Sequence, residues 1–272
     1  MENKMNEVMK QDVTEEVLAQ VEERILKLER ETKDNKEYNA HNLAADAVRI
    51  AEEVIKEYLR NPCYIVHFAS GDPNSKTHIM SIDLMPYVTC HPRCRETCGK
   101  IDAGKKYNGK RCYAFRLMYR NPATCARYAV NTALAILDPE TFWQDVEHML
   151  YTQRFVRCFV AGDAFLPGWF ERLCKAAENN PHCKIQAFSK CYEIVNDYID
   201  KNGALPKNLV ILLSGWEEMK PDNPHNLPIS DVYDSELPEG WLSCGGNCLQ
   251  CACVGLGCWK AQNGDVVGIK KH

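Results

Sequence analysis

The sequence contains no apolar run long enough to span a bilayer, which excludes a membrane-spanning protein. Its opening stretch, MENKMNEVMKQDVTEE, also lacks the apolar core of a secretory signal. We find no internal repeat and no low-complexity tract. These absences predict a cytoplasmic globular protein that has no membrane partner.

Cysteine is abundant, with 15 among 272 residues, although nothing in the sequence predicts disulfide bonds. A chain of this length can bury a core without covalent help, and the cytosol keeps thiols reduced. The odd count argues the same way, since full pairing would leave one cysteine over. We therefore expect many of these thiols to bind a metal ion or an iron–sulfur cluster.

The formal net charge of −4 hides a strongly basic stretch. Residues 91–130 hold 10 Lys and Arg but only 2 Asp and Glu. Such a stretch can contact phosphates, so nucleic acid is a candidate partner. Alternatively, these cations neutralise an anionic cluster and its thiolates or simply keep a loop solvated.

Apolar periodicity predicts an α/β core between two less regular segments. Strands are expected at 63–69, 78–84, 155–161, 183–188 and 208–213. Helices are expected at 113–137, 139–152, 167–179 and 192–201. This alternation predicts a parallel sheet or partial (βα) barrel, with functional loops after the strands. We divide the chain into a helical extension (1–60), the core (61–220) and a cysteine-rich tail (221–272), where regular structure is expected to fade.

The N-terminal extension is expected to form two helices with apolar stripes. Val17, Val21, Ile25 and Leu28 recur at spacings of three and four residues, and a second stripe runs through 41–60. An α-hairpin packed on the core explains both stripes. A homodimer formed through these helices is the alternative, although clean heptads are few.

The first cysteine group comprises Cys90, Cys94, Cys98 and Cys112, in a loop after an early strand. Soft thiolates on a loop can wrap an iron–sulfur cluster. Four cysteines also satisfy tetrahedral zinc, but zinc sites favour two separated pairs of ligands. The spacing here therefore favours iron–sulfur over zinc.

The tail carries five cysteines within fifteen residues, interleaved with glycine. Glycine allows backbone to fold closely around a compact inorganic centre. We assign Cys244, Cys248, Cys251 and Cys258 as the metal ligands and call these four residues the tail cysteine group. Cys253 is then the one cysteine of the five that does not bind the metal. Zinc is again the alternative metal. Among the isolated cysteines, core packing is expected for Cys63, Cys158, Cys174 and Cys183, whereas Cys125 and Cys191 stay undecided.

Ala161-Gly162-Asp163 closes the predicted strand that follows the first cysteine group. In these features the core resembles the radical S-adenosylmethionine (SAM) superfamily. Enzymes of that superfamily carry a three-cysteine cluster loop after the first strand of a partial α/β barrel and a small-Gly-acidic turn after the second, which Ala161-Gly162-Asp163 matches. The usual spacing is C-x3-C-x2-C, whereas the gaps in this chain are of three, three and thirteen residues.

A second set of short motifs spreads over most of residues 64–272. These motifs are Ser75-Lys76, Cys112-Tyr113-Ala114, Val160 to Asp163, Phe188-Ser189-Lys190, Leu213 to Trp216, Asn223 to Pro228 and the Cys-Gly-Gly-Asn-Cys segment that begins at Cys244. Together they give a closer resemblance, to the gene product 88 family of phages and prophages. The resemblance implies a phage or mobile-element origin, and hence the cytoplasm of a bacterial host. It supplies no established reaction.

The radical SAM resemblance implies roles for particular residues. Cys90, Cys98 and Cys112 would hold a [4Fe–4S] cluster, with Cys94 as the uncertain fourth ligand. Asp163 would accept hydrogen bonds from the SAM ammonium group beside Gly162. Lys190, Ser189 and Ser214 would line the mouth of the barrel, with Lys190 close to the chemistry. The tail group would hold a second, auxiliary [4Fe–4S] cluster.

Three functional hypotheses follow from these patterns. The first is an iron–sulfur enzyme that uses SAM. The second is a phage nucleic-acid-binding protein, stabilised by zinc or a cluster and without catalysis. The third is an iron–sulfur protein that transfers electrons or senses redox state.

Overall fold

The computed structural model describes residues 11–35, 37–60, 63–66, 79–98, 112–216 and 219–270. The helices are α1 (Thr14–Thr32), α2 (Ala40–Tyr58), α3 (Pro92–Cys98), α4 (Tyr113–Arg120), α5 (Pro122–Leu137), α6 (Pro139–Thr152), α7 (Trp169–Asn179), α8 (Tyr192–Asn202), α9 (Cys248–Val254) and the 3₁₀ turn η2 (Gly257–Trp259). The strands are β1 (Gln11–Asp12), β2 (Cys63–Tyr64), β3 (Met80–Ile82), β4 (Phe155–Cys158), β5 (Lys184–Ser189), β6 (Leu209–Ser214), β7 (Ile229–Tyr233), β8 (Leu242–Ser243) and β9 (Val266–Lys270).

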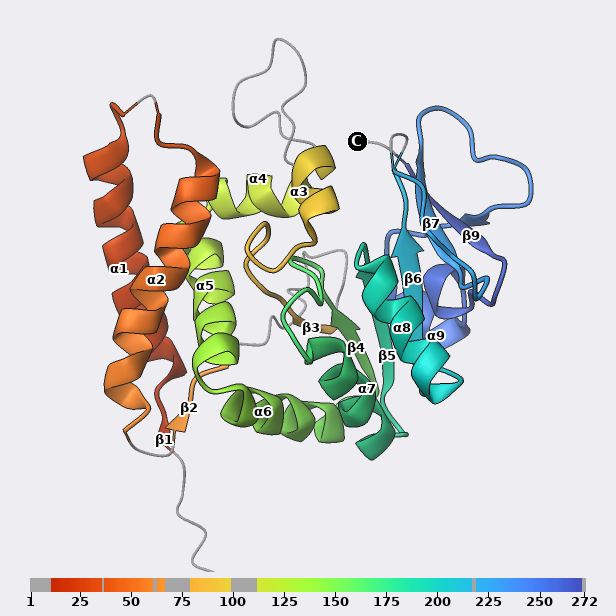
Figure 1. The fold of residues 1–272 in the computed structure, drawn as a ribbon, viewed down its shortest axis with the longest axis horizontal. Coiled ribbons are helices and arrows are strands. Elements are labelled where there is room, and N and C mark those ends of the chain that lie inside the picture. The colour runs from red at the N-terminus through yellow and green to blue at the C-terminus, as the bar shows by residue number, and fades with distance from the viewer. Residues whose placement is uncertain are drawn as a thin grey trace, which may run out of the picture.

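Seven strands form one sheet in the order β3-β4-β5-β6-β7-β9-β8, and each neighbouring pair is parallel. The predicted α/β class with a parallel sheet is therefore confirmed. The strands from β3 to β7 follow one another in chain order across the sheet, with α7 and α8 connecting β4, β5 and β6 (Figure 1). None of the helices within the described ranges combines the length and the apolar character needed to cross a membrane.

The two faces of the sheet have different covers, as the alternation of side chains along a strand requires. From one face, Val156, Ile185 and Ile211 join the large core that also contains the buried sides of α5 to α8. From the other face, Phe155 and Leu212 pack in a smaller core with Trp259 and Cys258 of the tail. We call this second side the tail-covered face.

The N-terminal helices pack within the chain. Val17, Val21 and Ile25 of α1 are fully buried, and both α1 and α2 lie against α5 (Figure 1). Asn39 begins α2 as a reciprocal capping box with Asn42. The expected α-hairpin on the core is therefore present. The homodimer stays a prediction, since contacts inside the chain already cover the apolar stripes that suggested it.

The single helix expected over 113–137 is two helices, α4 and α5, that break at Asn121. A residue before proline is pushed out of the helical region, and Asn121 has extended backbone before Pro122. Its side chain accepts a hydrogen bond from Thr124 N at 3.2 Å and so begins α5. The break lets α4 run in a different direction from α5 (Figure 1).

Two expectations about strands need correction. Within residues 63–66 of the strand expected at 63–69, the structure has the two-residue β2, which pairs with β1 in a separate small sheet, and residues 67–69 lie outside the described part of the chain. Regular structure also does not fade after residue 220, because β7, β8 and β9 extend the main sheet. The strand β9 pairs with β7 over five residues, so the cysteine-rich segment is held against the core at both of its ends.

Candidate metal and cofactor site

The predicted site residues follow three neighbouring parallel strands at the ends where those strands stop. Gly162 and Asp163 come after β4, Ser189 ends β5 with Lys190 next, and Ser214 ends β6. Carboxyl ends of parallel strands share one edge of a sheet, which is where ligands of α/β proteins bind. These residues accordingly meet in space, as the hydrogen bonds among them show.

Asp163 ties the turn after β4 to the turn after β5. Its carboxylate accepts hydrogen bonds from Ala164 N at 2.7 Å, Ser189 Oγ at 2.8 Å and Lys190 N at 2.7 Å. The side chain is buried, and this burial raises the pKa of Asp163, whereas the three hydrogen bonds act in the opposite direction. Asp163 therefore fixes the shape of the site from inside the protein.

Lys190 and Ser214 connect β5 to β6 at the same edge. Lys190 Nζ donates to Ser214 Oγ at 2.7 Å, and Tyr192 Oη donates to the carbonyl oxygen of Ser214 at 2.5 Å. The ammonium group of Lys190 is thus held at the end of the sheet by a neutral hydroxyl. An anionic or carbonyl group of a ligand at this place could accept from it.

Gly162 permits a close contact between this turn and the segment that leads to the first cysteine group. Its φ is +77°, and a Cβ there would lie 2.5 Å from Thr89 Oγ1 and 2.7 Å from Leu84 Cβ. Thr89 Oγ1 in turn accepts a hydrogen bond from Asp163 N at 3.2 Å. Only glycine fits this conformation and this space together.

The structure brings three members of the first cysteine group together. Cys90 and Cys94 are buried and pack against each other and against Cys112. Cys98 ends α3, but its side chain and residues 99–111 lie outside the described part of the chain. The expected loop therefore contains a short helix, and three soft sulfur donors lie close to one another beside it.

Cys191, which the sequence left undecided, connects the first cysteine group to the edge of the sheet. The Asp163 carboxylate and the backbone of His91 both lie within interaction range of its thiol, and its backbone N–H donates to Ser189 Oγ at 3.0 Å. Burial, followed by the Asp163 carboxylate, raises the pKa of Cys191. No sequence spacing marked this cysteine, because the contact joins residues one hundred positions apart.

The tail cysteine group lies on the tail-covered face. Cys258 is buried and lies within electrostatic reach of the other three members, and both Cys244 and Cys253 are exposed. Burial raises the pKa of the Cys258 thiol to about 12, and Arg157 acts in the opposite direction. A Cβ at Gly245 would lie 3.2 Å from Cys251 Sγ, so glycine lets backbone pass close to this sulfur.

As far as their side chains are described, the two cysteine groups do not have the arrangement of a finished metal site. Within the residues that the structure describes, no three His, Cys, Asp or Glu side chains converge as metal ligands do. The donor chemistry nevertheless suits a thiolate-bound metal or cluster, since each group places several soft sulfur donors close together. Iron–sulfur and zinc therefore both stay predictions for these residues.

Several arginines of the basic stretch have partners within the protein. Arg93 pairs with Glu193, Arg127 lies 3.6 Å from Asp83, and Arg95 donates to two backbone carbonyl groups. Lys76 and the cations of 100–111 lie outside the described residues. Arginines that already serve the fold offer less charge to phosphates, so the nucleic-acid partner stays a prediction.

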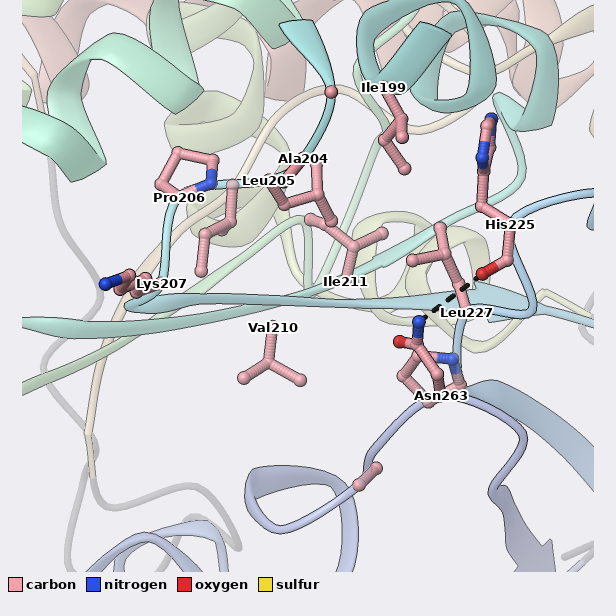
Figure 2. Close-up of a pocket in the computed structure, with 14 residues that line it drawn as sticks. Ile199, Ala204, Leu205, Pro206, Lys207, Val210, Ile211, His225, Leu227 and Asn263 are labelled. Carbon is pink, nitrogen blue, oxygen red and sulfur yellow. Dashed lines mark hydrogen bonds between the residues drawn. The ribbon is translucent and has the colours of Figure 1, made fainter.

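A separate hollow of about 400 Å³ lies near the amino-terminal end of β6 (Figure 2). Ile199, Leu205 and Leu227 supply much of its apolar lining. His225 borders it, with Nε2 at 3.1 Å from an Asp200 carboxylate oxygen. None of the predicted site residues lines this hollow, so it is not the site at the carboxyl edge.

Together, the fold and the site define a parallel α/β protein with a polar, cysteine-flanked site at the carboxyl edge and a second cysteine group on one face. A family model described as "Gene product 88" matches residues 67–252, and the chain belongs to this family. Neither the curated proteins nor the solved structures include a match to the chain. The expected family membership is therefore confirmed.

Proposed function

We propose that this gene product 88 family member is an iron–sulfur protein with two clusters, and that its first cluster serves a SAM-dependent radical reaction. The observation that carries the proposal is the position of the first cysteine group. Cys90, Cys94 and Cys112 pack together, and Cys191 connects the same segment to Asp163 at the carboxyl edge of the sheet.

The strand order supports this proposal. Strands β3 to β7 are parallel and follow chain order, as the strands of a (βα) barrel do, whereas a doubly wound sheet reverses direction at a switch point. The radical SAM-like partial barrel is thus our preferred interpretation of the sheet. The cysteines follow β3, the first strand of that series.

The first cluster would use Cys90, Cys94 and Cys112 as ligands, with Cys98 as a further candidate. A [4Fe–4S] cluster at this place would supply the single electron that SAM cleavage requires. Lys190 and Ser214 would orient the polar part of a ligand at the same edge. Asp163 already accepts three hydrogen bonds from its own chain, which favours a positioning role over direct contact with SAM.

The tail group would hold the auxiliary cluster through Cys244, Cys248, Cys251 and Cys258. The alternative functions are zinc-stabilised nucleic-acid binding and simple electron transfer or redox sensing. The arginines that already pair within the fold weigh against nucleic-acid binding.

The test is anaerobic purification followed by iron, sulfide and zinc analysis, then reduction in the presence of SAM. We expect iron and sulfide in nearly equal amounts and the release of 5′-deoxyadenosine. The double variant Cys90→Ala/Cys94→Ala should lose about half of the iron and all SAM cleavage. The control is Cys174→Ala, which removes a buried thiol of α7 that lies far along the chain from the two cysteine groups. This variant should keep the full iron content and the SAM cleavage.

The same measurements distinguish the alternatives. Zinc without sulfide would contradict the iron–sulfur proposal and favour a structural metal. Iron and sulfide without SAM cleavage would leave the electron-transfer or redox-sensing function. Within the tail, Cys253→Ala should retain the full iron content, whereas Cys258→Ala should lose the auxiliary cluster.

A further inference from the structure

Arg157 is a cation in the middle of a parallel strand, a position where a charged side chain needs a reason. It lies on β4, in register with Ser81 of β3 and Gln186 of β5. Its Nε donates to Gln186 Oε1 at 3.1 Å, and its Cζ lies 5.4 Å from the centre of the Phe188 ring. The neighbouring strand therefore fixes the orientation of the guanidinium group.

The guanidinium group points toward the tail cysteine group. Its Nη1 donates to Cys248 Sγ at 3.5 Å, a contact between residues 91 positions apart. Arginine keeps its positive charge in folded proteins, and Cys248, Tyr113, Cys258 and Asp83 lie within electrostatic reach of its guanidinium group. The cation is thus retained on the tail-covered face.

Asp83 is the carboxylate among the groups that act on Arg157, and it has closer partners. Arg127 lies 3.6 Å from Asp83 Oδ2, and Ser81 Oγ donates to the same oxygen at 3.0 Å. Arg157 donates hydrogen bonds to a neutral amide and a sulfur instead. Among the described residues that act on Arg157, this leaves the tail thiols of Cys248 and Cys258, together with the phenol of Tyr113, to balance its charge.

We propose that Arg157 is the positioning residue and charge partner of the centre bound by the tail cysteine group. Held by Gln186 and Phe188, it orients Cys248 toward that centre and offsets the negative charge of its thiolate ligands. This inference rests on the proposed metal-binding function of the tail, and it adds a residue that no cysteine pattern identifies.

Any metal that the thiolates bind leaves negative charge for Arg157 to balance. A divalent ion with four thiolates carries two net negative charges. Burying these charges against a sheet is unfavourable because they lose their hydration. A fixed cation with an N–H···S hydrogen bond reduces that cost. Groups that orient metal ligands in this way typically change metal affinity 10–100-fold when removed, and hydrogen bonds to sulfur help to set cluster potentials.

The experiment titrates metal-free, reduced full-length protein with Co²⁺ and follows the thiolate-to-cobalt absorption band. Cys248→Ala/Cys251→Ala identifies the part of the band that belongs to the tail. Arg157→Gln removes the charge, Arg157→Lys keeps it, and Arg154→Gln is the matched control. Arg154 is an exposed arginine three residues earlier, whose guanidinium lies over the Phe155 ring.

We expect Arg157→Gln to weaken Co²⁺ binding at the tail by roughly 10–100-fold. Arg157→Lys should retain part of the affinity, and Arg154→Gln should match the wild type. In iron- and sulfide-loaded protein, Arg157→Gln should also shift the midpoint potential of the tail cluster to a more negative value. Circular dichroism of each variant checks that the fold is retained.

Unchanged affinity in a folded Arg157→Gln variant would overturn the inference while leaving the proposed function intact. An effect of Arg157→Gln on Co²⁺, in a protein that is isolated with zinc alone, would support the inference and contradict the iron–sulfur proposal. Absence of any tail-dependent band in the wild type would overturn the metal-binding role of the tail together with the role of Arg157.

Discussion

At the turn after β4, the absence of one side chain allows two parts of the site to meet. Gly162 has positive φ and lies against Thr89 and Leu84, in the segment that leads to the first cysteine group. The next residue, Asp163, binds the turn after β5. This short turn therefore holds the first cysteine group in position relative to Lys190.

We predict that Gly162→Ala destabilises the protein by about 2–4 kcal/mol, through positive φ together with crowding against Thr89 and Leu84. Gly203→Ala is the matched control, since Gly203 has φ +84° but no atom within 4 Å of the added Cβ. That variant should lose only about 1 kcal/mol. Urea denaturation followed by circular dichroism measures both, and equal losses would show that crowding is not important at Gly162.

The sequence could place Gly162, Asp163, Lys190 and Ser214 at the ends of strands because those strands have clear apolar character. The radical SAM resemblance supplied their expected roles, and the structure brings these residues together. Arg157 was not selected, although a charge inside the predicted strand FVRCFVA was a usable signal. Cys191 had no such signal, because its contacts with His91 and Asp163 depend on how distant segments pack.

At the scale of elements, α5 is the helix on which the N-terminal extension rests. Most of its residues are buried, and it lies against both α1 and α2. An almost wholly buried helix needs cover on several sides, which the two amphipathic helices provide. The extension therefore belongs to the structural core, although the family match begins only at residue 67.

We predict that Val21→Asp destabilises the protein by about 3 kcal/mol or more, because it places a charge in the fully buried contact of α1 with the core. Leu26→Asp is the control on the same helix, since Leu26 is 39% exposed, and it should change stability by at most about 0.5 kcal/mol. Thermal denaturation measures the stability of each variant, and light scattering measures its mass in solution. If Val21→Asp had half the mass of the wild type and unchanged stability, the predicted homodimer would be favoured instead.

Element boundaries were predictable where a local signal fixes them. Pro139 begins α6 after the capping residue Asp138, and its predicted range of 139–152 agrees with the structure. The Asn121-Pro122 break was equally local, but the apolar periodicity on both sides obscured it. The pairing of β2 with β1 and the position of β9 between β7 and β8 are nonlocal, and no local pattern specifies a partner strand.

At the scale of the whole molecule, the tail is part of the core. Trp259 is 1% exposed, and its ring meets the Phe155 ring edge-on with 5.6 Å between the ring centres. Its carbonyl oxygen accepts a hydrogen bond from Lys184 Nζ at 2.6 Å. These partners begin β4 and β5, so the segment after the tail cysteines covers the sheet directly. Metal binding in the tail should consequently influence the stability of the entire sheet.

We predict that Trp259→Ala lowers the stability of the whole chain by about 3–5 kcal/mol, since it empties a large buried volume beneath β4 and β5. Calorimetry of the metal-free, reduced protein should show one transition, moved down by roughly 10 °C. Val254→Ala is the control, because Val254 lies in the same tail but is 60% exposed, and it should unfold as the wild type does.

The number of transitions decides between one unit and two. If residues 221–272 formed an independent module, Trp259→Ala would move a small separate transition and leave the main one unchanged. A shared transition follows from the sheet instead, because β7 lies within residues 221–272 and pairs with β6 of the core, so unfolding of the tail removes the neighbour of β6. Working in the metal-free form excludes ligand loss at the adjacent Cys258 as the cause, so the shift reports packing alone.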